Sequence, residues 1–198
     1  MSETINTDAR SISLRTLSGH EFKAAEMLWY DIYVREMQRE QAYTSHEIGT
    51  ISDPLQAKAI IVGAFFRERL IGTVRANLPN EVDLSSYLDF YDVERLGPEA
   101  SKSCAVVTRI MVRQEFRSTT ASVRLSANMF RLLQKRGVRW ILCDCNDPVL
   151  PFFLRLGFEI HKEGAVHPDY GTVTILKIDS SLPIYSRFKS TLLTRFAY

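Results

Sequence analysis

A corner rich in hydroxyls and arginines lies at residues 113–122, RQEFRSTTAS, directly after the apolar run CAVVTRIMV. The run predicts a strand and the amphipathic pattern after it predicts a helix, so the corner is a helix N-terminus of the kind that binds anions. Such corners usually contain glycine, because the backbone must approach a phosphate closely. This corner has no glycine, and its polar side chains belong to Arg113, Arg117, Ser118, Thr119, Thr120 and Ser122.

Two arginines stand inside apolar strands. Arg75 lies in LIGTVRANL and Arg109 lies in VVTRIMV. A buried charge is costly unless it is paired, so each guanidinium needs a partner. Together they would form a fork for a carboxylate, such as that of a free amino acid. The alternative is an internal salt bridge with Asp53 or Glu81.

His167 and Asp53 are the candidates for removing a proton from an ammonium group near neutral pH. His167 has a competing interpretation as a turn histidine bonded to Asp169. Cys104 and Cys143 lie in apolar runs without a neighbouring base, as is typical of core cysteines rather than nucleophiles. No histidine stands at metal-ligand spacing near the cysteines, so we expect no metal.

A basic stripe follows the corner. Arg117, Arg124 and Arg131 recur at seven-residue intervals, and Lys135 extends the series. This spacing places them on one side of a helix predicted at 119–136. Such a stripe suits an acidic partner, whose encounter with the protein it would speed. The other interpretation is a solvated helix face.

The order of the elements predicts a mixed α/β sheet in a single domain, 1–198. A capping box of Ser18 and Glu21 predicts a helix that begins near Gly19, and Asp147 is expected to cap a short helix from Pro148. A final helix is expected over 181–198. The predicted strands are 11–17, 57–66, 70–78, 103–112, 138–145, 158–164 and 171–179.

Composition narrows the class of protein. The chain has 198 residues, 45% of them hydrophobic, and a net charge of +2, which indicates a globular domain and gives no ground for nucleic-acid binding. The odd number of cysteines favours a reduced, cytoplasmic compartment. The polar start, MSETINTDAR, is not typical of a signal peptide, and no apolar run reaches the length of a membrane span.

The element order and two motifs resemble the GNAT N-acyltransferase fold. VTRIMVRQEFRSTTASVRL is similar to the donor-binding strand and loop of that family, and CNDPVLPFFLRLGF is similar to its second motif. Thr120 replaces the loop glycine, and Phe153 stands where many members have a tyrosine acid. The resemblance implies a mixed central sheet with a splayed central strand pair flanked by helices. It also implies that the donor is bound by the corner together with Ile110, Met111, Val112, Ala121, Asn146 and Phe153.

A narrower branch fits more of the chain. YDIYVREMQ, SDPLQAKAIIVGAF and LIGTVRANLP resemble acyltransferases that use acyl carrier protein: LuxI-type acyl-homoserine lactone synthases and FeeM-type long-chain N-acyl amino acid synthases. Arg75, Arg109 and Asp53 match charged positions of this branch. Val106 and Trp29 stand where the lactone synthases have a glutamate and an arginine, and AVHPDYGTVTIL is more similar to the amino acid synthases.

The resemblance implies the reaction. A fatty acyl group passes from the phosphopantetheine arm of acyl carrier protein, or from acyl-CoA, to the amine of an amino acid or a similar small acceptor, with no tightly bound cofactor. The carrier arm bears one phosphate and no nucleotide, which suits a corner without glycine. The acidic carrier protein would dock on Arg124, Arg131 and Lys135. The alternatives are lactone synthesis, a CoA-dependent acetyltransferase with an altered loop, and a non-catalytic module that binds acyl chains.

Overall fold

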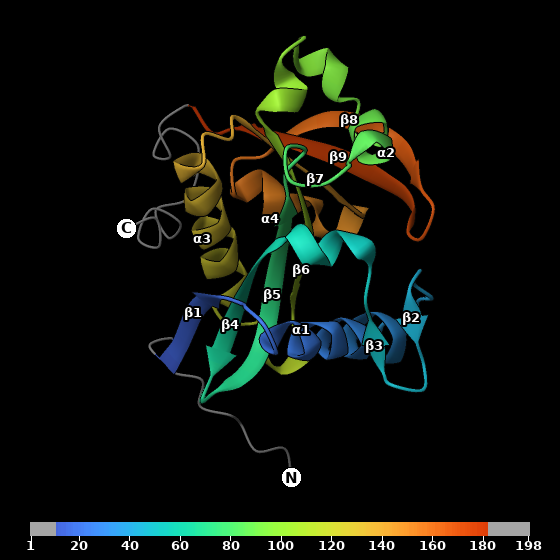
Figure 1. Cartoon of the computed structure of the whole chain (residues 1–198), viewed down its shortest axis with the longest axis vertical. Coiled ribbons are helices and arrows are strands. Elements are labelled where there is room, and N and C mark those ends of the chain that lie inside the picture. The colour runs from blue at the N-terminus through green and yellow to red at the C-terminus, as the bar shows by residue number, and fades with distance from the viewer. Residues whose placement is uncertain (1–10, 182–198) are drawn as a thin grey trace.

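The computed structural model describes residues 11–181, which form one seven-stranded mixed sheet with helices on both faces (Figure 1). The strand order is β1-β4-β5-β6-β7-β9-β8. The predicted strands are confirmed, whereas the helix predicted from residue 181 onward lies outside the described residues. The strands are β1 (Ile12–Thr16), β4 (Ile60–Phe66), β5 (Arg69–Asn77), β6 (Cys104–Val112), β7 (Trp140–Cys145), β8 (Glu159–His167) and β9 (Gly171–Asp179), and a separate pair joins β2 (Thr44–Ser45) to β3 (Thr50–Ile51).

The central strands β6 and β7 are parallel, and they separate. Their pairing runs from Cys104 opposite Trp140 to Val106 opposite Leu142, and the other neighbouring strands of the sheet are antiparallel. β6 nevertheless continues to Val112. Backbone amides along a strand need partners, so the edge of β6 beyond the pairing is where an extended ligand can add. The expected splayed pair is therefore present.

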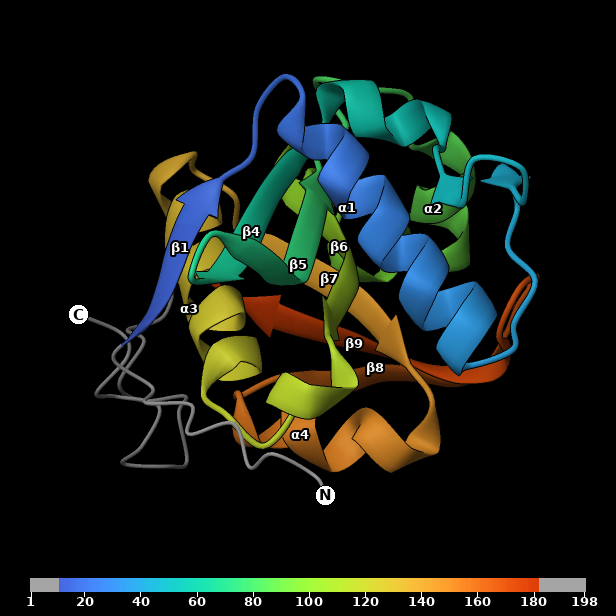
Figure 2. The same ribbon diagram turned by 90° about the horizontal axis from the view of Figure 1, so that it is seen from below.

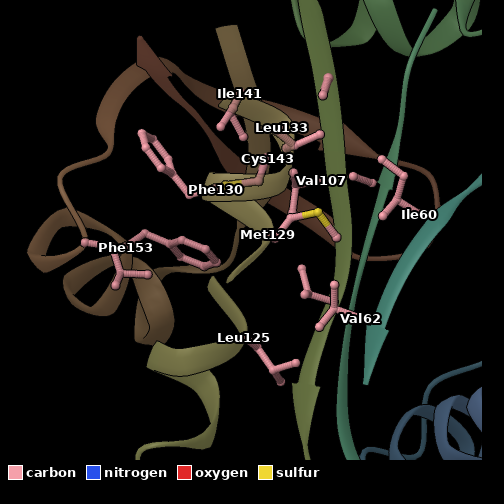
Figure 3. Close-up of a cluster of buried hydrophobic side chains, with 14 of the residues drawn as sticks. Ile60, Val62, Val107, Leu125, Met129, Phe130, Leu133, Ile141, Cys143 and Phe153 are labelled. Carbon is pink, nitrogen blue, oxygen red and sulfur yellow. The ribbon is translucent and has the colours of Figure 1, made fainter. Parts of the chain in front are cut away.

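One face of the sheet is covered by α3 (Ala121–Lys135) and α4 (Leu150–Arg155). Apolar side chains of α3, among them Leu125 and Met129, pack on Val62 and Val107 of the sheet (Figure 3). Phe153 of α4 is 4% exposed and points into the same core. Hydrophobic burial explains this helix face, whose apolar residues recur at helical spacing.

The other face carries α1 (Glu21–Tyr30) and α2 (Ser85–Phe90) (Figure 2). The capping box is half formed: the Glu21 carboxylate accepts from the Ser18 amide at 3.1 Å. Beyond Tyr30 the helix widens into a π-helical segment, Asp31–Glu36, a form often found at functional sites. Asp147 does not make the predicted cap. Instead a 3-10 turn, Asp147–Val149, leads into α4 without a side-chain cap.

Short 3-10 turns complete the described chain at Pro54–Lys58, Val93–Leu96, Ala100–Lys102 and Gln114–Phe116. No helix in the described range 11–181 is both long enough and apolar enough to cross a membrane.

Candidate active site

Asp53 joins the two strand arginines on the α1 face. Its Oδ2 accepts from Arg75 at 2.6 Å and from Arg109 at 3.3 Å, and its Oδ1 accepts from the Leu55 amide at 3.0 Å. All three charged side chains are less than a tenth exposed. The sequence left Asp53 and Glu81 open as partners, and the structure selects Asp53, because Glu81 pairs with Arg136.

The cluster carries an excess positive charge. Two guanidinium groups meet one carboxylate, so the sum of the three charges is +2 − 1 = +1. Burial by itself raises the pKa of Asp53, but the two arginines outweigh burial and hold the pKa below its ordinary value. Asp53 is therefore ionised at neutral pH, and both of its oxygens are engaged. This environment makes it an anchor for the arginines and a weak proton acceptor.

The two arginines differ in what else they contact. Arg75 is enclosed and donates to the Thr108 hydroxyl at 3.0 Å. Arg109 reaches further and donates to Gln41 Oε1 at 3.2 Å, an atom that also accepts from the Tyr170 hydroxyl at 2.8 Å. The Arg109 guanidinium lies about 5 Å from the ring centroids of Trp29 and Tyr33, and Tyr33 stacks on Tyr170. Aromatic faces favour a cation at this distance.

A β-bulge aims Arg109 into this position. Thr73 pairs with Met111 and Arg75 pairs with Thr108, so β6 has one more residue than β5 between these pairs. Arg109 takes the left-handed conformation, φ 54°, which is uncommon for a residue with a side chain. The Thr73 hydroxyl donates to the Arg109 carbonyl at 3.1 Å and accepts from the Trp29 indole at 2.9 Å. Trp29, which stands where the lactone synthases are expected to have an arginine, therefore stabilises the bulge through Thr73.

His167 ends β8 beside this cluster. Its ring stacks on Tyr170 at 4.2 Å, and its Nδ1 accepts from the Asp169 backbone amide at 3.0 Å. Because that amide is the donor, neutral His167 carries its proton on Nε2 and has no free lone pair for another proton. Burial lowers the pKa of His167, while the charges of Asp144 and Asp169 oppose the shift. The turn interpretation is therefore the one that the hydrogen bonding favours.

The corner after β6 is held by acidic side chains of the π-helical segment. Arg113 donates to Asp31 at 3.1 Å, and Arg117 pairs with Glu36 at 2.5 Å. The Thr119 hydroxyl accepts from the Ala121 amide at 3.2 Å and so occupies one donor of the helix N-terminus. Thr120 Oγ1 is buried without a hydrogen-bond partner within the described part of the chain. Such a hydroxyl is a ready partner for a ligand oxygen.

The rest of the predicted basic stripe is less exposed than expected. Arg124 and Arg131 are partly buried, and Arg124 donates to the Ile12 carbonyl of β1 at 2.6 Å. Lys135 is exposed. Carrier-protein docking on these residues stays a prediction, and Arg124 has at least one structural task in joining α3 to β1.

Asn146 connects three segments at the edge of the site, and three further residues of the site were not predicted from the sequence. Asn146 donates from Nδ2 to the Thr172 carbonyl at 3.3 Å and accepts from Arg39 at 3.4 Å, so it ties β7 to β9 and to the loop after α1. Gln41 and Tyr170 were not predicted, since they are 129 positions apart and no local pattern relates them. Asp144 was also missed, although the alternation along β7 places it on the same face as Asn146.

Buried cysteines do not supply a nucleophile. Burial raises the pKa of Cys104 and of Cys145 to about 11, and it raises the pKa of Cys143 well above the ordinary value. At pH 8 about one thiol in a thousand is then ionised. We expect iodoacetamide at pH 8 to leave the activity unchanged over an hour. Rapid loss of activity together with alkylation of one cysteine, measured by mass spectrometry, would contradict this expectation.

The fold and the splayed, bulged central strands define a GNAT-fold acyltransferase. A GNAT-family protein from Desulfovibrio desulfuricans is similar in fold, with a TM-score of 0.56, 11% identity, and coverage of 85% of this chain and 99% of that chain. The family model described as N-acyl amino acid synthase FeeM matches residues 24–179, and the chain belongs to that family. A search of curated proteins found no significant match.

Solved structures from two related groups of acyltransferases share the fold. FeeM, an N-acyl amino acid synthase from uncultured soil microbes, has a TM-score of 0.66 and 14% identity, over 93% of this chain and 99% of that chain. MesI, a CoA-dependent acyl-homoserine lactone synthase, has a TM-score of 0.66 and 22% identity, over 90% of this chain and 93% of that chain. The predicted family and fold are confirmed, and the predicted acyltransferase activity agrees with them.

Proposed function

We propose that this enzyme transfers a fatty acyl group from acyl carrier protein to the α-amine of an amino acid with a free carboxylate. The observation that carries the proposal is the buried Arg75–Asp53–Arg109 cluster, because its two guanidinium groups and one carboxylate sum to a net positive charge. A substrate carboxylate would balance it, and a desolvated arginine binds a carboxylate more strongly than an exposed one.

Arg109 is the residue that we assign to the acceptor carboxylate. Besides Asp53, Arg109 donates to the Gln41 amide oxygen, which is neutral and can be displaced at lower cost than a carboxylate. Arg75 is 2% exposed and binds Asp53 at the shorter distance, so we assign it to holding Asp53 in place. The predicted fork thus becomes one binding arginine and one supporting arginine.

The corner supports a donor with little negative charge. Its two arginines are already paired with Asp31 and Glu36, so they add little net positive charge for the several phosphates of coenzyme A. The hydroxyls remain, and Thr120 Oγ1 is a buried donor near the helix N-terminus. One phosphodiester of a carrier-bound pantetheine arm needs no more than this. MesI, whose fold is similar, is a CoA-dependent synthase, so coenzyme A is the alternative donor that the test must distinguish.

The reaction that we propose is direct transfer between the two substrates. The pantetheine arm pairs with the open edge of β6 at Ile110, Met111 and Val112. The acceptor amine attacks the thioester carbonyl, backbone amides near the Arg109 bulge stabilise the oxyanion, and the thiol leaves. Carrier protein and coenzyme A thioesters are cytoplasmic substrates, and the three free cysteines suit that compartment.

The donor test compares kcat/KM for one acyl chain presented on acyl carrier protein and on coenzyme A. We expect the carrier protein to be preferred by about tenfold or more, the value of one lost charged contact. The acceptor in both arms is the amino acid that the enzyme uses best in a screen. Equal or better use of acyl-CoA would reject the carrier protein while leaving the N-acyltransferase activity in place.

A further inference from the structure

Asp144 projects from β7 where that strand has separated from β6. The last pair of the parallel strands is Val106 opposite Leu142, and Asp144 lies two residues further along β7. Side chains alternate along a strand, so Asp144 lies on the face of Leu142, which is the face of the Asp53 cluster. Cys143 and Cys145 point into the opposite core, beneath α3 and α4. Asp144 is partly exposed, whereas both cysteines are buried.

A buried tyrosine orients the Asp144 carboxylate. The Tyr91 hydroxyl donates to Asp144 Oδ1 at 2.5 Å, and Tyr91 is 1% exposed. Tyr87 stacks on Tyr91, which fixes the ring. Burial and the charge of Asp144 raise the pKa of Tyr91 far above its ordinary range, so the phenol keeps its proton and always donates. One carboxylate oxygen is thereby held, and within residues 11–181 the second oxygen accepts no hydrogen bond.

The two proton acceptors predicted from the sequence, Asp53 and His167, are engaged in other contacts. Asp53 binds two arginines and a backbone amide, and His167 uses Nδ1 to accept from the Asp169 amide. The His167 ring stacks on Tyr170, whose hydroxyl donates to the same Gln41 oxygen as Arg109 does. Burial lowers the pKa of His167, the charges of Asp144 and Asp169 raise it, and Arg109 lowers it.

We propose that Asp144 binds the ammonium group of the acceptor amino acid and receives its proton, with Tyr91 as the residue that positions the carboxylate. This inference rests on the proposed function. An amino acid is a zwitterion, and the site offers a positive charge at Arg109 and a negative charge at Asp144 for its two ends. Asp144 supplies this negative charge from β7, the strand beside the one that carries Arg109.

The proton transfer balances with the groups at hand. The ammonium gives one proton to Asp144, and the free lone pair attacks the thioester carbon. When the tetrahedral intermediate collapses, the carbon–sulfur bond breaks and the second nitrogen proton goes to the departing thiolate. Asp144 then releases its proton to water. The excess positive charge of the arginine cluster lowers the proton affinity of the acceptor amine and so favours loss of its proton.

The test is Asp144→Asn, which keeps the shape and still accepts from Tyr91. We expect kcat/KM for the best amino acid to fall by about a hundredfold or more, the usual contribution of a positioned base. Asp147→Asn, an exposed aspartate just beyond the strand, is the matched control and should behave like the wild type. The titratable groups beside Asp144 are Tyr91 and His167, whereas the thiols of Cys143 and Cys145 lie on the opposite face of its strand.

Aminooxyacetate is a second acceptor, and the ratio of its kcat/KM to that of the amino acid does not depend on the fraction of the variant that is folded. It carries a carboxylate and an amine that is already unprotonated at neutral pH. Asp144→Asn should therefore lose much less activity with aminooxyacetate than with the amino acid. Tyr91→Phe, which removes one hydrogen bond to the carboxylate, should move the acidic limb of the kcat/KM profile to higher pH.

The possible outcomes distinguish the role of Asp144 from the proposed function. Equal losses for both amines in Asp144→Asn, or an unchanged kcat/KM for the amino acid, would overturn the role of Asp144 and leave the proposed function standing. An unmoved acidic limb in Tyr91→Phe would overturn the positioning role. A wild type that acylates no amino acid from either donor would overturn the proposed function and this inference with it.

Discussion

Replacing Asp53 with asparagine is expected to lower the free energy of unfolding by about 3–5 kcal/mol, because two buried guanidinium groups lose their counter-charge. The side chains of Arg75 and Arg109 are 2% and 8% exposed, so water cannot replace the carboxylate. Asparagine has nearly the same size and its oxygen can still accept from the Leu55 amide. The decrease in the free energy of unfolding therefore measures the loss of the negative charge and not a change in side-chain shape. Urea denaturation followed by circular dichroism measures it.

Asp89→Asn is the matched control for this change, because Asp89 is exposed on α2. Its unfolding midpoint should stay close to that of the wild type. An Asp53→Asn protein with the same midpoint as the control would show that the two arginines are neutralised by another group. The proposed excess charge of the cluster would then be wrong as well.

The Asp53 pairs also give the stability a pH dependence of known sign. Burial raises and the arginines more strongly lower the pKa of Asp53, so its pKa in the folded protein lies below the unfolded value of about 3.9. The stabilisation is complete above that value and is lost as the pH falls through the folded pKa. We expect the difference in stability between wild type and Asp53→Asn to be constant near neutrality and to shrink below about pH 4.

The strands, the hairpin and the long helix were predictable because each leaves a local pattern. Alternation marks β1, apolar runs mark the buried central strands, and apolar residues at helical spacing mark α3. The need for a partner at Arg75 and Arg109 was also predictable, since a charge in an apolar strand must be neutralised. The identity of the partner could only be narrowed to Asp53 or Glu81, because the choice depends on how a loop folds over the sheet.

The bulge at Arg109 has no local signature. A positive φ usually favours glycine or asparagine, and here tertiary contacts through Thr73 and Trp29 impose it on an arginine. The pairing of Arg117 with Glu36 escaped prediction for a related reason, because ion pairs between distant segments follow from the packing of the elements. The predicted position of α3 is confirmed, and the role of its arginines in docking a carrier protein stays a prediction.

Replacing Arg109 with methionine is expected to remove the preference of the enzyme for a free carboxylate. We expect kcat/KM for the amino acid to fall about tenfold to a hundredfold, the value of a charged hydrogen bond, and kcat/KM for the amino acid amide to change little. Methionine keeps an unbranched side chain against Trp29 and Tyr33, and Asp53 keeps its 2.6 Å bond to Arg75. Steady-state kinetics with both acceptors measure the ratio.

Arg75→Met is the matched variant that separates binding from structure. Arg75 is enclosed and holds both Asp53 and Thr108, so its loss should lower the melting temperature more than the loss of Arg109 and should affect acid and amide alike. Arg109→Met should show the reverse, a small change in melting temperature and a large change in the acid-to-amide ratio. If the preference for the acid survives in Arg109→Met, this guanidinium does not bind the acceptor carboxylate. If the preference for the acid is lost in Arg75→Met instead, Arg75 binds the acceptor carboxylate and Arg109 is the arginine that holds Asp53.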